Sequence, residues 1–154
     1  MKKILMLSGI LMFMAMMFSV SAHAHCQIPC GIYGDEIRFQ MIEEDIRTVE
    51  KAMKEIVALS KEGDKNYNQI VRWVNNKDEH AGRIQETVHQ YFMTQRLSPV
   101  EKEKTGEYRK YVEKLELLHQ MLFYAMKAKQ TTDLNYVEKL RSVLGRFRTA
   151  YFAQ

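Results

Sequence analysis

The sequence predicts an all-α protein, an antiparallel up-and-down four-helix bundle that follows a short N-terminal hook. Three observations predict this fold class. Apolar residues recur at spacings of three and four in four separate segments after residue 34. Short stretches of turn-forming residues separate these segments, and the alternation typical of a half-buried strand is absent from the sequence. Four amphipathic helices on short connections bury their apolar stripes by packing against one another.

The first two helices are expected on either side of a break at Gly63 and Asp64. Asp35 can cap the first helix. Its apolar stripe contains Phe39, Ile42, Ile46, Val49, Met53 and Ile56. The stripe of the second helix contains Ile70, Val74, Ala81, Ile84, Val88 and Tyr91. Asn75, Asn76 and Lys77 interrupt that second stripe, which predicts a helix that bends or is exposed midway.

The third and fourth helices have clear local signals. Ser98 can cap a helix, Pro99 suits its first position and Glu101 completes a capping box, so a third helix is predicted to start there. Its stripe contains Tyr108, Tyr111, Leu115, Leu118, Leu122 and Ala125. Residues 131–133 predict the next turn. The last helix carries Val137, Leu140, Leu144, Phe147 and Tyr151.

Residues 1–24 have the pattern of an export signal. Two lysines precede an apolar run over residues 4–20, and Ala22 and Ala24 occupy the positions that signal peptidase prefers. Cleavage before His25 predicts an exported protein, periplasmic or secreted, without a membrane segment. Its parts are the cleaved signal (1–24), the hook (25–34) and the bundle (35–154). Loss of the two lysines lowers the formal charge from +4 to +2, and the interspersed charges that remain argue against nucleic-acid binding.

The hook begins with a dense set of metal donors. Cleavage gives His25 a free amine, whose pKa is ordinarily about 8, beside its own imidazole. The two cysteines of the chain, Cys26 and Cys30, add thiolates. The Cys26 amide lies between the amine and a thiolate, which favours planar coordination by two nitrogens and two sulfurs. Such a set suits nickel(II) or copper(II) better than zinc, and paired thiolates tend to reduce copper(II).

These residues resemble the nickel superoxide dismutase family, whose mature N-terminus reads His-Cys-x-x-Pro-Cys-Gly-x-Tyr. All six specified positions match the segment that begins at His25. The resemblance implies one nickel ion per subunit, bound by the amine and imidazole of His25, the amide and thiolate of Cys26 and the thiolate of Cys30. It implies that Tyr33 stands at the mouth of the site and orders water. It also implies a cis peptide bond between Ile28 and Pro29.

The activity implied by the resemblance is conversion of superoxide to oxygen and hydrogen peroxide through a Ni(II)/Ni(III) cycle. The catalytic residues would be His25, Cys26, Cys30 and Tyr33. The resemblance also implies an antioxidant role and a homohexamer. Gln27 occupies a position that is acidic in some members, which changes the local charge.

A different class of function remains open from the residues themselves. In an oxidising compartment Cys26 and Cys30 can form a disulfide, which would leave an exported helical bundle that binds metal or a partner without catalysis. The predicted helices carry His80, His89 and His119, which are expected to be surface or packing residues. Glu86 and His89 supply one Glu-x-x-His pair, whereas di-iron bundles need two. Trp73 is expected in the core or a subunit interface, and Tyr91 is a candidate second aromatic near the hook.

Overall fold

The computed structural model describes residues 34–153, which form four long helices and two shorter helical segments. The order is α2 (Asp35–Ser60), η2 (Gly63–Asn66), α3 (Tyr67–Glu86), η3 (Thr87–Arg96), α4 (Thr105–Gln130) and α5 (Asn135–Phe152). These residues contain no strand. The prediction of an all-α four-helix bundle is therefore confirmed for the part of the chain described. No helix in this part is both long and apolar enough to span a membrane.

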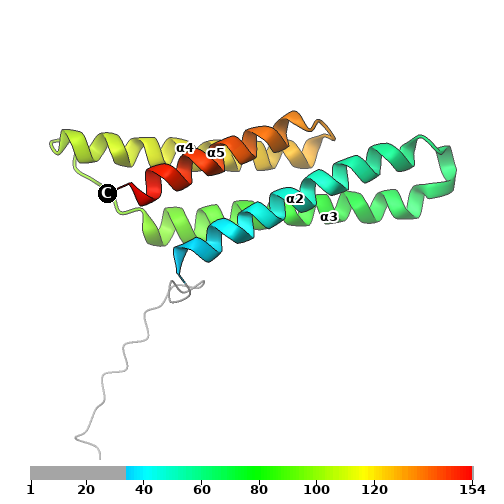
Figure 1. Cartoon of the computed structure of the whole chain (residues 1–154), viewed down its shortest axis with the longest axis horizontal. Helices are drawn as coiled ribbons and strands as arrows, with labels where there is room; N and C mark the ends of the chain where they lie inside the picture. The colour runs from blue at the N-terminus through cyan, green and yellow to red at the C-terminus, as the bar shows by residue number, and fades with distance from the viewer. Residues whose placement is uncertain (1–33, 154) are drawn as a thin grey trace, which may run out of the picture.

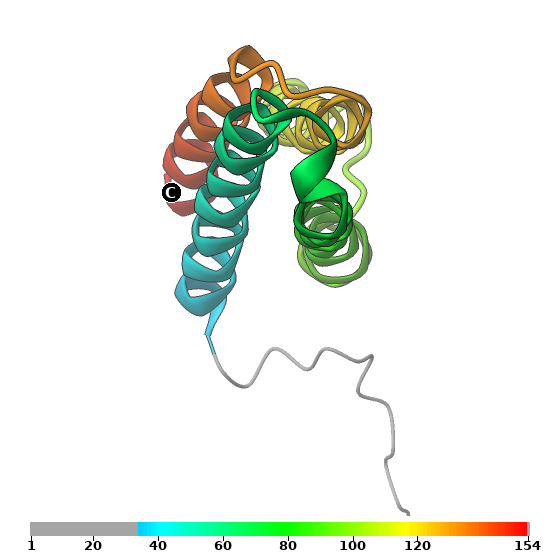
Figure 2. The ribbon, with the colours of Figure 1, turned by 90° about the vertical axis from the view of Figure 1, so that its right-hand side faces the viewer.

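The helices run up and down around one core. Each packs against the next along the chain, and α5 returns to pack against α2 (Figures 1 and 2). The start of α2, the start of α4 and the end of α5 therefore lie at one end of the bundle (Figure 1). This end is also where the preceding hook joins the chain.

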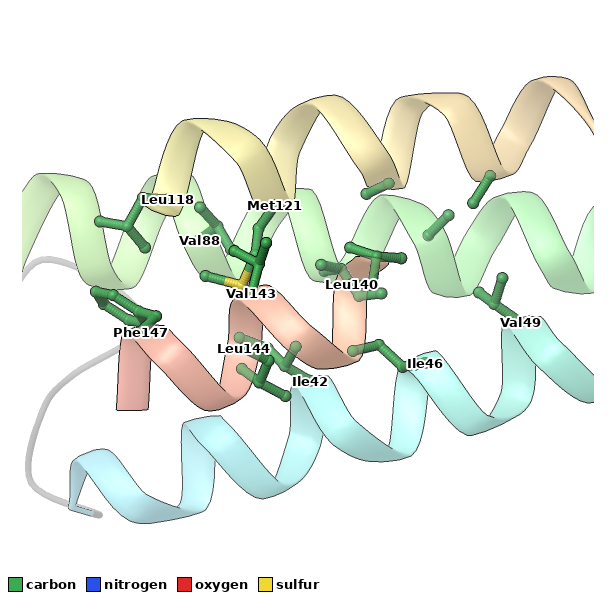
Figure 3. Packing of buried hydrophobic residues seen from close by; sticks show 14 of the residues in the cluster. Ile42, Ile46, Val49, Val88, Leu118, Met121, Leu140, Val143, Leu144 and Phe147 are labelled. Carbon is green, nitrogen blue, oxygen red and sulfur yellow. The ribbon is translucent and has the colours of Figure 1, made fainter. Parts of the chain in front are cut away.

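The core contains the residues that the helical periodicity selects. On α2, the predicted positions Phe39, Ile42, Ile46, Val49 and Met53 are all buried. Figure 3 shows three of these facing buried side chains from η3, α4 and α5. The opposing residues drawn there include Val88, Leu118, Met121, Leu140, Val143, Leu144 and Phe147.

The core is aromatic near the start of α2. The Phe92 ring centroid lies 4.9 Å from that of Phe39, 5.0 Å from that of Phe147 and 5.5 Å from that of Tyr151. Edge-on contacts predominate around Phe92, an arrangement that aromatic rings prefer to face-to-face stacking. This cluster ties together α2, η3 and α5.

The second helix is exposed midway at Asn75 and half-buried at Asn76, as predicted, but Lys77 is buried. Helix α3 continues through residues 75–77, and Lys77 is only 3% exposed. Its ammonium donates hydrogen bonds to the carbonyl oxygens of Ala128 (2.9 Å) and Lys129 (2.5 Å) and to the Asp78 carboxylate (2.7 Å). Lys77 thus neutralises the C-terminal end of α4, where carbonyl groups lack partners within the helix.

Replacing Lys77 with methionine should lower the free energy of unfolding by about 2–3 kcal/mol, because the carbonyls at the end of α4 lose a charged donor. Methionine keeps a long apolar stem, so the packing change is small. Urea denaturation followed by circular dichroism measures the loss. Lys65→Met, at an exposed position in η2, is the control and should change stability little. Equal stabilities of the two variants would contradict the assigned role of Lys77.

The third helix starts later than predicted. Residues 97–101 have no helical structure, and α4 begins at Thr105. Every residue from 101 to 107 is exposed, so a helix begun at Ser98 would have no apolar face over these turns. A capping box contributes about 1 kcal/mol, which does not replace missing tertiary contacts. The turn predicted at residues 131–133 is confirmed, since Asp133 accepts a hydrogen bond from the Asn135 amide at 2.9 Å.

The end of the second predicted helix winds as a π-helix. Segment η3 (Thr87–Arg96) follows α3 directly, and the Leu97 amide donates to the Phe92 carbonyl at 3.0 Å, five residues back. Within η3 the consecutive residues Tyr91 and Phe92 are both fully buried. The π-helix is rare and appears mostly as single-turn bulges, which are frequent at functional sites.

Candidate functional site at the hook junction

The predicted metal ligands His25, Cys26 and Cys30, and the predicted gate Tyr33, lie outside the described residues. The structure does describe the point at which the hook joins the bundle, from Gly34 onward. Within residues 34–153 no group of three or more His, Cys, Asp or Glu side chains could hold a metal ion. The hook is the metal site that the sequence predicts, and its junction with the bundle is described by the structure.

Gly34 turns the chain into α2. Its φ of 80° lies in the left-handed region, which glycine adopts at no steric penalty and other residues rarely adopt. Helix α2 begins at the next residue and has no side-chain cap. The prediction that Asp35 caps this helix is wrong, because Asp35 is its first residue and its carboxylate bonds elsewhere.

The Asp35 carboxylate is held by side chains from two other elements. Its Oδ1 accepts hydrogen bonds from the Tyr91 hydroxyl at 2.5 Å and from Arg96 Nε at 2.8 Å. Its Oδ2 accepts one from the Tyr151 hydroxyl at 2.8 Å. Arg96 also donates to the Tyr91 hydroxyl at 3.0 Å. We call Asp35, Tyr91, Arg96 and Tyr151 the anchor network.

Two guanidinium groups flank the central tyrosine of the network. The Arg38 and Arg96 guanidinium carbons lie 4.9 Å and 5.0 Å from the centroid of the Tyr91 ring. Both distances suit cation–π attraction. Tyr91 itself is completely buried and makes an edge contact with Phe92. The anchor network therefore rests directly on the aromatic core.

The two hydroxyl groups in the network are not available as proton donors to a substrate. Both donate to Asp35. Burial, followed by the hydrogen bond to this carboxylate, raises the pKa of Tyr91 and of Tyr151 above the ordinary value for tyrosine. Each phenol keeps its proton and uses it to hold Asp35.

The anchor network stabilises the negative charge of the Asp35 carboxylate. Burial acts to raise the pKa of its carboxyl, but the hydrogen bonds from Tyr91 and Tyr151 and the charge of Arg96 outweigh burial and hold that pKa below the ordinary value. A lowered carboxyl pKa in the folded protein stabilises the fold at pH values above the unfolded pKa, which is about 3.9. This stabilisation is lost as the pH falls through the folded pKa.

The sequence identified only part of this arrangement. Tyr91, the candidate second aromatic, donates a hydrogen bond to Asp35, which follows Tyr33 by two positions in the sequence. The sequence pattern indicates Asp35 only as a cap and Tyr151 only as a residue of the apolar stripe, and it gives no signal for Arg96. A helical period shows which face is buried, but it does not show which buried polar groups meet across 116 residues.

The histidines on the helices are surface and packing residues, as predicted. His89 and His119 are exposed. His80 is partly buried, and its Nδ1 lies 2.7 Å from Oδ1 of Asp45, which is buried on α2. Burial raises the pKa of Asp45 above its ordinary value, against the opposing effect of His80. This pair joins α2 to α3 on one side of a groove of about 350 Å³.

The model of a family described as nickel-containing superoxide dismutase matches residues 20–154. This range covers the hook and all four helices of the bundle. No match was found among curated proteins or among solved structures.

Proposed function

This chain belongs to the nickel-containing superoxide dismutase family, and from that premise we propose that its nickel is bound by the hook through His25, Cys26 and Cys30. The protein is accordingly a superoxide dismutase, an oxidoreductase that acts on superoxide and uses nickel. Two superoxide ions and two protons give one molecule of oxygen and one of hydrogen peroxide. The family match from residue 20 onward is the observation that carries the proposal.

The donors of the hook fit nickel. After cleavage, one short segment offers the His25 amine and imidazole, the Cys26 amide and the thiolates of Cys26 and Cys30. Nitrogen and thiolate donors in one plane suit a divalent nickel ion. Nickel bound there would supply the one-electron Ni(II)/Ni(III) couple, which strong thiolate and amide donors bring into a useful range. One ion per subunit follows from one hook per chain.

The other residues of the hook are proposed to control access and shape. Tyr33 would stand at the mouth of the site, restrict what reaches the metal and order water there. Pro29 limits the conformations of the loop between the two cysteines, and Gly31 permits unusual dihedral angles. The bundle then acts as the support to which the hook is attached.

We further propose that the ligand set depends on export. Removal of residues 1–24 by signal peptidase would expose the amine of His25 and would place the protein in the periplasm or outside the cell. A homohexamer is proposed on the family resemblance. The bundle has exposed apolar side chains, among them Tyr67 and Val71, that a subunit contact would cover.

The mass and metal content of the exported protein test the proposal. A chain that begins at His25, retains both thiols and holds nickel in a one-to-one ratio supports it. A metal-free chain that lacks the mass of two hydrogens contains the Cys26–Cys30 disulfide instead, and it would favour a non-enzymatic binding protein. Copper in place of nickel would favour a metal-trafficking role.

A further inference from the structure

We propose that Asp35 is a positioning residue for the nickel site, which it serves by fixing the direction in which the hook leaves the bundle. This inference rests on the proposed function, because it concerns the hook as the nickel site. It follows from the anchor network, in which side chains from two other helical segments bind the Asp35 carboxylate.

Both oxygens of the Asp35 carboxylate are bound from different elements. Oδ1 is held from η3 by Tyr91 and Arg96, and Oδ2 is held from α5 by Tyr151. A carboxylate bound on both oxygens has little freedom to rotate. The backbone of Asp35 is therefore fixed relative to two other helical segments as well as its own.

The first turn of α2 depends on these contacts. The helix has no side-chain cap at its N-terminus, so the network supplies the tertiary restraint that a cap would otherwise supply locally. Only Gly34 stands between Asp35 and Tyr33. The orientation of Asp35 therefore sets where the hook begins.

The proposed ligands are close to this fixed point. Four residues separate Cys30 from Asp35, so their Cα atoms lie within about 18 Å of each other even in a fully extended chain. Catalysis is sensitive to small displacements of a site, with losses of about 100-fold for about 1 Å. A loosened junction should therefore affect a site attached by so short a tether.

A neighbouring ion pair provides a matched control. Glu36 Oε1 accepts a hydrogen bond from Arg148 at 2.6 Å, so this pair also joins the first turn of α2 to α5. Its side chains are 42% and 52% exposed, compared with 26% for Asp35. Glu36→Gln removes a carboxylate charge beside Asp35 and leaves the anchor network in place.

The experiment compares Asp35→Asn and Glu36→Gln with the parent protein, first without nickel. Hydrogen exchange of the backbone amides of residues 38–41, the first that can bond within α2, should accelerate about tenfold in D35N and remain unchanged in E36Q. The difference in Tm between D35N and the parent should be present at pH 7 and shrink as the pH falls below about 4, because the parent then loses its own carboxylate charge. Unchanged exchange in folded D35N would overturn the proposal.

The nickel-loaded proteins provide the second comparison. D35N should bind the same amount of nickel, because none of the proposed ligands has changed, while its kcat falls about tenfold and its Ni(III) electron paramagnetic resonance signal broadens. E36Q should match the parent in all three. If loaded D35N keeps the parent spectrum and kcat, Asp35 serves stability alone and the positioning role is wrong.

A milder variant covers the case in which D35N does not fold. Tyr151→Phe removes only the hydrogen bond to Oδ2 and keeps the ring in the aromatic core. It should show the same changes in smaller degree, and full identity with the parent would count against the proposal. If the parent protein itself binds no nickel, the proposed function fails, whereas the hydrogen-exchange comparison still decides whether Asp35 restrains the junction.

Discussion

An alanine inserted before His25 in the mature protein should abolish dismutase activity and leave the helical content unchanged. The insertion moves the free amine one residue away from the His25 imidazole and the Cys26 amide. The amine, the Cys26 amide and the Cys26 thiolate then no longer have the spacing proposed for planar coordination of one metal ion. The bundle starts at Asp35 and does not involve the inserted residue.

Activity, nickel content and circular dichroism check this prediction, and the N-terminal mass confirms that cleavage left the added alanine in place. An alanine added after Gln154 is the control, because it lengthens the chain equally and leaves the amine of His25 untouched. Full activity of the N-terminally extended protein would contradict the proposed ligand set.

Replacing Phe92 with alanine should lower the free energy of unfolding by about 3–5 kcal/mol. Phe92 is fully buried, and its ring contacts those of Phe39, Phe147 and Tyr151. Its loss opens a cavity under the anchor network, in a domain whose total stability should be about 5–15 kcal/mol. The Tm should fall by roughly 10–20 °C.

Thermal unfolding of the nickel-free protein measures this effect. Phe123→Ala is the matched control, because Phe123 is 44% exposed on α4 and its removal should change stability by less than about 1 kcal/mol. A similar Tm for the two variants would mean that the aromatic cluster contributes no more than a surface residue does.

The fold could be predicted because its signals are local and periodic. The buried positions of α2, from Phe39 to Met53, follow a period of about 3.6 residues, and solvent exclusion from one helix face is enough to produce that pattern. The start of α4 could not be predicted in the same way. The residues at Ser98 have the pattern of a helix cap, but residues 101–107 are all exposed and have no side chain packed in the core.

For the candidate site as well, residues close together in the sequence could be predicted and contacts between distant residues could not. The proposed donors His25, Cys26 and Cys30 could be put forward from the sequence because they all lie within residues 25–30, outside the described part of the chain. The anchor network could not be predicted, because nothing in a single sequence indicates that Asp35 and Tyr151 form a hydrogen bond. Lys77 illustrates the same limit, since a polar residue on an apolar stripe looks like a defect until the end of α4 is placed beside it.

The hydrogen bond from Tyr151 to Asp35 also limits when, during synthesis of the chain, the start of α2 can be attached to α5. The two residues are 116 positions apart, so a ribosome must add most of the domain after Asp35 before this contact can exist. Contacts of such sequence separation close large loops, which costs conformational entropy and slows folding. Although the hook is synthesised before the bundle, the hydrogen bond that attaches its junction to α5 can form only after nearly the whole domain has been made.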